Sequence, residues 1–195
     1  MTVVLALDIA KNRTGWAVGG ASWKLPKWGT FETERFDDRP GYWLKKWHDF
    51  LLMMVHDHKV SMIAVETFFI DLRDFSFQGT VPMAQMHGIV HLVIELKGLR
   101  GGEASSSSWR KRFIGVGEAP KWIPPKKRTE WWKRQALDMA IERGWYVTYH
   151  DEAEALGLLD FTLCSVDIVY AGRTDPLFRR VEMRQDMARV RRGAE

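Results

Sequence analysis

The 195-residue sequence is poor in cysteine and lacks several features that would direct it outside the cell. Its single cysteine, Cys164, excludes an internal disulfide framework and favours a reducing compartment. No apolar stretch approaches the roughly 20 residues that are needed to span a bilayer. The first apolar run has no basic region before it and is interrupted by Asp8, which argues against a signal peptide. We therefore expect a soluble, cytoplasmic protein.

Charge is unevenly distributed along the chain. The net charge is +4, but residues 110–134 hold nine basic residues against Glu118 and Glu130, so this segment carries +7 and the remainder −3. The tryptophans that interleave with these bases are Trp109, Trp122, Trp131 and Trp132. A basic, aromatic-rich segment is typical of phosphate contacts combined with base stacking, which predicts nucleic-acid binding. The alternative is a solvated helix face whose tryptophans lie in the core.

Two carboxylates stand directly after apolar runs that are typical of buried strands. They are Asp8 and Glu66. Because ligand sites of α/β sheets lie at the carboxyl ends of the strands, we expect the two side chains to converge, although Asp8 could be a turn cap and Glu66 part of a buried ion pair. Asp151 and Glu154 are three residues apart, which places them on one face of a helix. Four converging carboxylates supply the oxygen ligands that Mg²⁺ or Mn²⁺ prefers.

The hydrophobic pattern predicts one mixed α/β domain, and the sequence has no internal repeat and no long low-complexity tract. Strands are expected at 3–9, 14–19, 28–36 and 61–66, with a short one near 103–107. Helices are expected at 40–58, 81–97, 128–143 and 152–170. We assign residues 1–172 to this domain and residues 173–195 to a basic C-terminal helix or tail.

Five short motifs, in order along the chain, resemble those of a known family. They lie at residues 7–17 (LDIAKNRTGWA), 64–69 (AVETFF), 85–88 (QMHG), 115–121 (GVGEAPK) and 151–156 (DEAEAL). Together they resemble the RuvC-type Holliday junction resolvases of the RNase H-like superfamily, and a phage-type member of that family would fit. The resemblance implies an RNase H-like α/β fold with a mixed five-stranded sheet flanked by helices.

The resemblance also implies an activity and a set of active-site residues. In the family, an enzyme of this kind is a crossover junction endodeoxyribonuclease, which hydrolyses phosphodiesters with two metal ions and acts as a homodimer that makes paired symmetric nicks in a four-way junction. The implied catalytic and metal-binding residues are Asp8, Glu66, Asp151 and Glu154. The implied cofactors are two Mg²⁺ or Mn²⁺ ions in each active site.

Ten residues are candidates for contact with DNA. Lys11 and Arg13 follow the first predicted strand closely, and Arg110 and Lys121 match basic DNA-contacting positions of the family. Phe69 has the offset of a family aromatic that wedges into the junction, whereas core packing is the alternative. The full set is Lys11, Arg13, Phe68, Phe69, Arg110, Lys111, Lys121, Lys126, Lys127 and Arg128.

The predicted helix at 152–170 leaves alternatives open for the residues around its start. Asp151 could cap the helix N-terminus, and Glu154 could lie on a solvated helix face. Glu152 lies on the neighbouring face and is not expected to bind metal. His150 could join the site, because imidazole can bind metal or act as a base.

Departures from the family pattern leave the substrate open as well. Ala10 stands where a glycine is usual, Glu154 stands where aspartate is more common, and residues 120–132 form an insertion. One alternative is therefore a looser nuclease that acts on forks, flaps or other branches. Another is an ATP-binding protein of the actin-like or sugar-kinase type, whose N-terminal Asp-Ile-Gly is also altered here by Ala10. A third is a non-catalytic DNA-binding module, against which the four acids argue.

Overall fold

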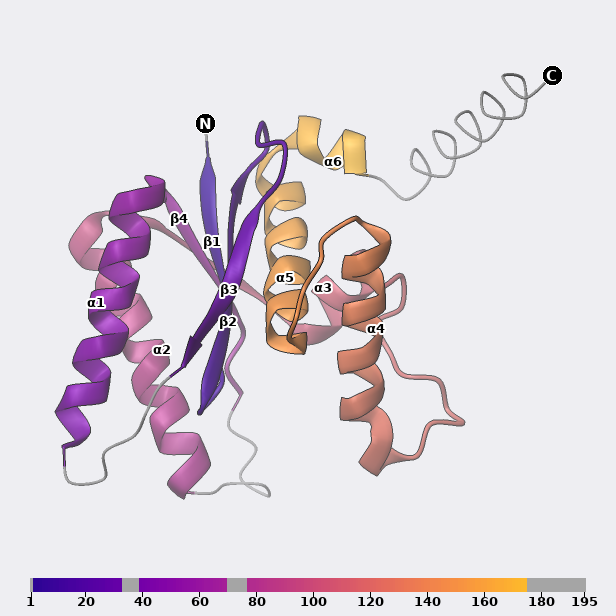
Figure 1. Ribbon diagram of the computed structural model, residues 1–195, viewed down its shortest axis with the longest axis horizontal. Helices are drawn as coiled ribbons and strands as arrows, with labels where there is room; N and C mark the ends of the chain where they lie inside the picture. Colours follow the sequence, from indigo (N-terminus) through magenta and orange to yellow (C-terminus); the bar gives the residue numbers. More distant parts are fainter. Residues whose placement is uncertain (1, 33–38, 70–76, 175–195) are drawn as a thin grey trace.

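A mixed five-stranded sheet lies at the centre of the computed structural model, which describes residues 2–32, 39–69 and 77–174 (Figure 1). Its strands are β1 (Val3–Asp8), β2 (Arg13–Gly20), β3 (Lys27–Glu32), β4 (Met62–Glu66) and β5 (Arg100–Ala104). Across the sheet the order is β3-β2-β1-β4-β5. The first three strands pair antiparallel, whereas β4 runs parallel to β1 and β5 parallel to β4. The predicted fold class is confirmed.

Helices cover both faces of the sheet. They are α1 (Pro40–His58), α2 (Phe77–Lys97), α3 (Ser106–Phe113), α4 (Arg128–Glu142), α5 (His150–Val166) and α6 (Ile168–Thr174), with the short 3-10 helix η1 (Pro125–Lys127) before α4. Figure 1 shows α1 and α2 on one face, with α5 against the other face and α3 and α4 outside it. Each face therefore has its own hydrophobic core.

The central strand β1 shows how the sequence builds these two cores. Successive side chains of a strand point to opposite faces of the sheet. Accordingly Val3, Leu5 and Leu7 belong to the core under α1 and α2. Val4 and Ala6 belong to the core under α5. Because both sets are buried, β1 is a continuous apolar run, as expected for a strand covered on both faces.

Several element boundaries differ from those expected. The short strand expected near 103–107 lies three residues earlier, at β5, and residues 106–113 form the unpredicted helix α3. Ser105 caps this helix by accepting a hydrogen bond from the backbone N–H of Ser108, so the serine run begins a helix. The helix expected from residue 81 begins at Phe77, because Pro82 is accommodated in its first turns. The helix expected at 152–170 begins at His150 and is interrupted at Asp167.

Other expectations are confirmed or fall outside the described residues. Helix α1 has the expected bounds, and Gly98 and Gly144 follow α2 and α4 with positive φ angles of 61° and 75°, which favour glycine. Residues 33–36 of the expected third strand and most of the predicted tail at 173–195 lie outside the described residues. Among the helices that the structure describes, none has the length and apolar character needed to cross a membrane.

Candidate active site

Strand geometry brings Asp8 and Glu66 to the same edge and the same face of the sheet. Both residues end their strands, and β1 and β4 are parallel neighbours. Residues of even number in these strands, such as Ala6 and Ala64, lie in the core under α5. Asp8 and Glu66 have the same parity, so they point to the α5 side at the carboxyl end of the sheet. The predicted convergence is therefore explained by the register.

The N-terminal turn of α5 approaches this edge closely enough to add Asp151 and Glu154. Gly15 is paired with Asp8 in the sheet, and a Cβ atom built on Gly15 would lie 1.9 Å from the backbone oxygen of Asp151. Only a glycine leaves room for α5 at this point. The close approach of backbone to backbone therefore sets the depth at which α5 enters the site.

Neighbouring residues of α5 have separate roles. Tyr149 is the N-cap, so the interpretation of Asp151 as the cap is wrong. Glu152 accepts hydrogen bonds from the backbone N–H groups of Thr148 and Tyr149, at 2.7 and 3.0 Å. Its carboxylate thus caps the N-terminus of its own helix and does not join the acidic cluster. The side chain of Glu154 is only 11% exposed, so the solvated-face interpretation of this residue is wrong as well.

The four carboxylates repel one another strongly. Burial raises the pKa of Asp8, and the other three carboxylates raise it further, Glu154 most of all. Burial raises the pKa of Glu154 to about 7, although the nearby Arg110 acts to lower it. Such repulsion is relieved when a divalent cation is bound, and carboxylate oxygens are the donors that Mg²⁺ and Mn²⁺ prefer. The donor set therefore fits a hard divalent metal ion.

Two arginines from different elements partly compensate the acidic cluster. The Nε atom of Arg13 lies 2.6 Å from Oδ2 of Asp151, and its guanidinium lies 4.0 Å from the ring centre of Tyr149. The Nη2 atom of Arg110 lies 3.6 Å from Oε1 of Glu154. The guanidinium of Arg110 also lies 5.1 and 4.9 Å from the rings of Trp109 and Trp132. The structure thus places two predicted DNA-binding arginines directly beside the acids.

His150 joins the cluster. Its Nδ1 atom is 2.6 Å from Oδ1 of Asp151 and 3.9 Å from Oε2 of Glu154, and one donor atom of each of these residues lies within 4.8 Å of the others. Its Nε2 atom is 3.2 Å from Nζ of Lys133. Burial lowers the pKa of His150, which keeps the imidazole neutral near pH 7. Lys133 was not singled out from the sequence, where it is one of nine bases in the basic segment.

Helix α3 holds the carboxylate of Glu66 at both oxygens. The indole N–H of Trp109 donates a hydrogen bond to Oε2 at 2.8 Å, and the hydroxyl of Ser106 donates to Oε1. Both donors are neutral, so the interpretation of Glu66 as part of a buried ion pair is not supported. Trp109 is 1% exposed and packs over Gly157 of α5, where a Cβ atom would lie 2.9 Å from the indole ring. The role of Ser106 was missed because residues 103–107 were expected to form a strand, and Trp109 was considered only as one of the tryptophans in the basic segment.

We expect Trp109→Phe to weaken metal binding by about 10- to 100-fold, because groups that orient a metal ligand typically contribute that much. Phenylalanine keeps an aromatic ring but cannot donate to Glu66. The test is Mn²⁺ titration of thermal stability, in which the stabilisation should shift to higher metal concentration. Phe113→Leu is the matched control, since Phe113 is equally buried on α3 and stacks on Trp145. Equal shifts in the two variants would show that packing alone is responsible.

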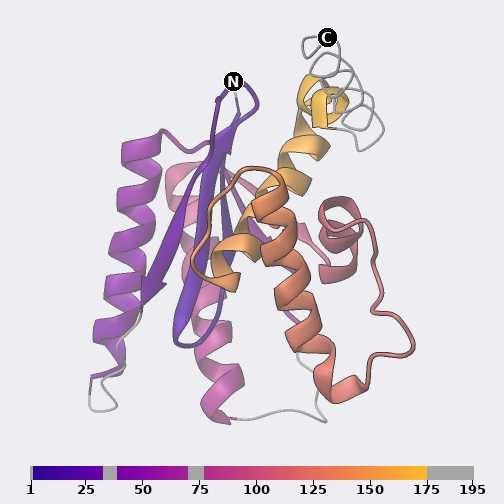
Figure 2. The ribbon, with the colours of Figure 1, turned by 45° about the vertical axis from the view of Figure 1, so that its right-hand side comes forward.

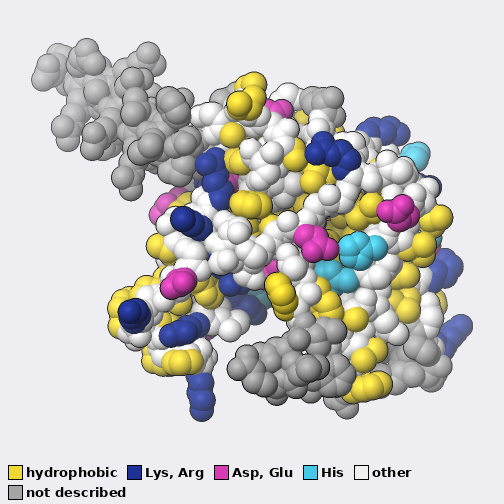
Figure 3. Space-filling model, turned by 180° about the vertical axis from the view of Figure 1, so that it is seen from behind, with side chains coloured by type: hydrophobic (Ala, Val, Ile, Leu, Met, Phe, Trp, Pro, Cys, Tyr) yellow, Lys and Arg dark blue, Asp and Glu magenta, His cyan; other side chains and the backbone are white. Residues whose placement is uncertain are grey.

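The basic candidates for DNA contact divide into those that share a hollow with Asp151 and those that do not. Lys11 and Arg13 line a hollow together with Lys133, His150 and Asp151. The exposed basic residues farther from the acids are Lys111, Lys121, Lys126, Lys127 and Arg128. Figure 3 shows Lys and Arg side chains on the lobe that contains the start of α4, at the lower left of that view.

Two adjacent phenylalanines line a second hollow with Asp8 and Glu66. Phe68 stacks on the ring of His87, with centroids 4.9 Å apart and an interplanar angle of 24°. Phe69 is 81% exposed, so the interpretation of Phe69 as a core residue is wrong. An exposed aromatic ring beside the acidic cluster is available to a bound molecule.

The sheet, the strand-end acids and the covering helices together define an RNase H-like nuclease fold. Solved structures share it: Thermus thermophilus RuvC has a TM-score of 0.56 at 16% identity, with 80% of this chain and 90% of that chain covered. The same protein in complex with a Holliday junction substrate has a TM-score of 0.58 at 12% identity, with 81% and 90% covered. Fowlpox virus resolvase with its substrate Holliday junction DNA has a TM-score of 0.51 at 12% identity, with 85% and 99% covered.

Sequence comparison gives the family. The crossover junction endodeoxyribonuclease RuvC of Rhizobium etli is 31% identical over 121 residues, which cover 60% of this chain and 69% of that protein. RuvC of Sinorhizobium medicae is 31% identical over 124 residues, which cover 62% and 72%. No protein-family model matches the chain. The chain belongs to the RuvC family, as the motifs indicated.

Proposed function

We propose that this protein is a metal-dependent endonuclease that resolves Holliday junctions. The observation that carries the proposal is the convergence of Asp8, Glu66, Asp151 and Glu154 at one edge of the sheet, in a chain of the RuvC family. The names of the relatives favour this nuclease over an actin-like or sugar-kinase-type ATP-binding protein. The acidic cluster favours an enzyme over a non-catalytic DNA-binding module.

The four acids, with His150 beside them, would hold two Mg²⁺ or Mn²⁺ ions. When bound, such a pair can activate a water molecule and stabilise the leaving oxygen of a phosphodiester. Trp109 and Ser106 orient the Glu66 carboxylate for this role. Once cations neutralise the acids, Arg13 and Arg110 are free to contact the phosphate backbone. The neutral imidazole of His150 can accept a proton.

The principal experiment is Mg²⁺-dependent cleavage of a synthetic four-way junction, with the nick positions mapped on all strands. Paired nicks at symmetric positions would support junction resolution. The looser alternative, a nuclease for forks and flaps, remains a candidate because an insertion follows Pro120. Comparable cleavage of a fork, a flap and a junction of the same sequence would favour that alternative. We infer that a protein with this activity acts on DNA inside the cell.

A homodimer would explain two symmetric nicks, because a junction has near two-fold symmetry. We propose that the outward face of α2 forms the interface. Gly88, Leu92 and Leu96 are spaced by four residues on this face, and the two leucines are 46% and 65% exposed. Light scattering after size-exclusion chromatography, with and without the change Leu92→Glu, tests this assignment. A monomeric wild-type protein at the concentration of the cleavage assay would contradict it.

We expect Phe69→Ala to impair cleavage of closed junctions by about tenfold or more. Opening base pairs at the branch point costs a few kcal/mol of stacking energy, and an inserted aromatic ring would offset that cost. Its melting temperature should be close to that of the wild type, since the ring is largely exposed. Junctions that are already open at the branch point should be cut almost normally. Cleavage of closed and pre-opened junctions in parallel provides the measurement, and Phe69→Tyr should retain activity. Equal losses on both junctions would reject the wedge.

A further inference from the structure

The segment between α3 and α4, residues 114–127, forms an arm that projects beside the start of α4 (Figure 2). Four tryptophans interleave with the basic residues of this region, and the structure separates them. Trp109 and Trp132 are buried, and Trp131 is partly buried against Trp132. Trp122, on the arm, is 76% exposed. The alternative in which these tryptophans lie in the hydrophobic core therefore does not account for Trp122.

The arm holds Trp122 in a defined position. The next residue, Ile123, is only 7% exposed and anchors the turn, and its backbone N–H donates to the carbonyl of Pro120 at 2.9 Å. The side chain of Arg128 donates to the carbonyl of Ile123 at 3.4 Å. Pro124 begins the next turn, which is closed by a 2.9 Å bond from the N–H of Lys127. A side chain presented on a preorganised turn loses little entropy on binding.

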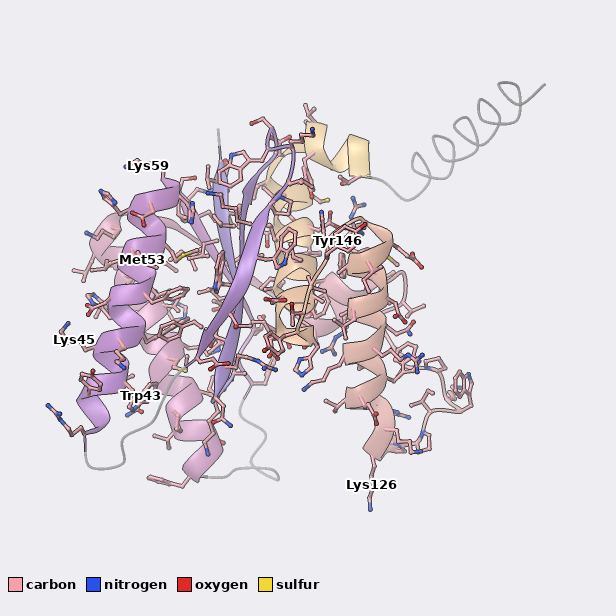
Figure 4. The ribbon with its side chains drawn as sticks, viewed as in Figure 1. Trp43, Lys45, Met53, Lys59, Lys126 and Tyr146 are labelled. Atoms are coloured by element: carbon pink, nitrogen blue, oxygen red, sulfur yellow. The ribbon has the colours of Figure 1, made fainter. Side chains whose placement is uncertain are left out.

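Basic residues precede and follow Trp122 along the arm and the start of α4. Lys121 adjoins it, and Lys126, Lys127 and Arg128 follow the turn with exposed side chains. Figure 4 shows Lys126, in η1 just before the start of α4, pointing away from the body. The site that this surface offers is an exposed indole ring on a segment that carries several exposed cations.

The arm continues one wall of the active site. On α4, Lys133 contacts His150 and Trp132 contacts Arg110, so the first turns of this helix border the acidic cluster. Arg128 lies five residues before Lys133, which corresponds to about 7.5 Å along the helix axis. A DNA strand that crosses the acids can therefore reach the arm within a few nucleotides.

We propose that Trp122 stacks on an unpaired base of the bound DNA while the neighbouring lysines contact its phosphates. The proposal rests on the proposed function and adds to it a preference for branched DNA with unpaired nucleotides near the branch point. Stacking on aromatic side chains accepts any base that has a free face. A base inside a duplex has no free face and must first be unstacked. A protein partner fits the surface less well, because lysine is depleted from protein interfaces.

The experiment compares binding of two junctions by protein carrying Asp8→Asn, which prevents cleavage. One junction is fully paired, and the other has two unpaired nucleotides at the branch point. We expect Trp122→Ala to weaken binding of the second junction by about 5- to 100-fold, and that of the first by about twofold at most. Its salt dependence should not change, because no charge is removed. A fluorescent base analogue, 2-aminopurine, at the unpaired position should be quenched by the parent protein and not by Trp122→Ala.

Two control variants sharpen the comparison. Trp122→Phe retains an aromatic face and should retain most of the preference for unpaired nucleotides. Tyr146→Ala removes another exposed ring, 83% exposed and distant from Lys126 in Figure 4, and should change nothing. Equal weakening on both junctions, or none, would overturn the proposal. A change of oligomeric state in Trp122→Ala with the preference intact would overturn it in favour of a protein contact.

Failure of the stacking proposal is distinguishable from failure of the proposed function. The wild-type protein is assayed in parallel for Mg²⁺-dependent cleavage of the fully paired junction. If it cleaves the junction and Trp122→Ala binds both junctions as the parent does, only the stacking role is rejected. If it neither binds nor cleaves branched DNA, the proposed function is rejected and the stacking role falls with it.

Discussion

Asp8→Asn is expected to abolish DNA cleavage without destabilising the metal-free protein. Asp8 is held among three other carboxylates, and both burial and their charges raise its pKa. An amide of nearly the same volume removes one repelling charge, so the metal-free protein should melt at the same or a higher temperature. The lost ligand should slow cleavage by about 10³-fold or more, since bound metals supply several kcal/mol of transition-state stabilisation.

Two measurements separate this explanation from simple damage to the fold. The wild type should gain thermal stability as Mn²⁺ is added, because a ligand that binds only the folded state stabilises it, and Asp8→Asn should lose this gain. Junction binding should persist in the variant, because its basic segment is unchanged. Glu152→Gln is the matched control: its carboxylate lies at the helix start, so cleavage should continue. An inactive Glu152→Gln with an active Glu154→Gln would mean that the wrong face of α5 was assigned.

Reversing the charges of Lys126, Lys127 and Arg128 to glutamate should produce the second large effect. These exposed residues lie at the start of α4, whose next turns border the acidic cluster. Each lost phosphate contact should reduce the slope of log affinity against log salt by about one, so the slope should fall by up to about three. Binding should be weakest relative to the wild type at low salt, where counterion release contributes most.

The control for this variant is a reversal of equal size on the opposite side of the molecule. Lys45, Lys46 and Lys59 belong to α1 or directly follow it, and Figure 4 shows Lys45 and Lys59 on the far side of the sheet from Lys126. Their reversal changes net charge identically but should leave most of the salt slope intact. If both triple variants flatten the slope equally, the effect is one of net charge, and the basic segment is not a specific DNA surface.

Much of the candidate site was predictable because it depends on local patterns. Asp8 and Glu66 end apolar strands. Because side chains alternate between the two faces along each strand, both residues lie on one face of the sheet. Asp151 and Glu154 are one helical turn apart, so their shared face follows from the sequence alone. The bounds of α1 followed likewise from its helical periodicity. The turn after α2 followed from Gly98, because glycine readily adopts the positive φ angle that the structure shows there.

Helix α3 shows why other parts could not be predicted. Its eight residues are too few for a clear helical period, and its serines suit a cap as well as a loop. The hydrogen bond from Trp109 to Glu66 joins residues 43 positions apart, and the contact of Arg13 with Asp151 joins residues 138 positions apart. No pattern within a window of the sequence encodes such pairs.

The sequence by itself determined the fold class, the identity of the acids and the location of the basic segment, because strand alternation, helical spacing and charge are local properties. Only the tertiary structure decided which side chains complete the site. It buried Trp109 against Gly157 and exposed Trp122 on the arm, although both are tryptophans beside basic residues. It did so because burial depends on what packs against a residue from distant parts of the chain. It also required Gly15, because the backbone of α5 at Asp151 comes too close to this position for any side chain.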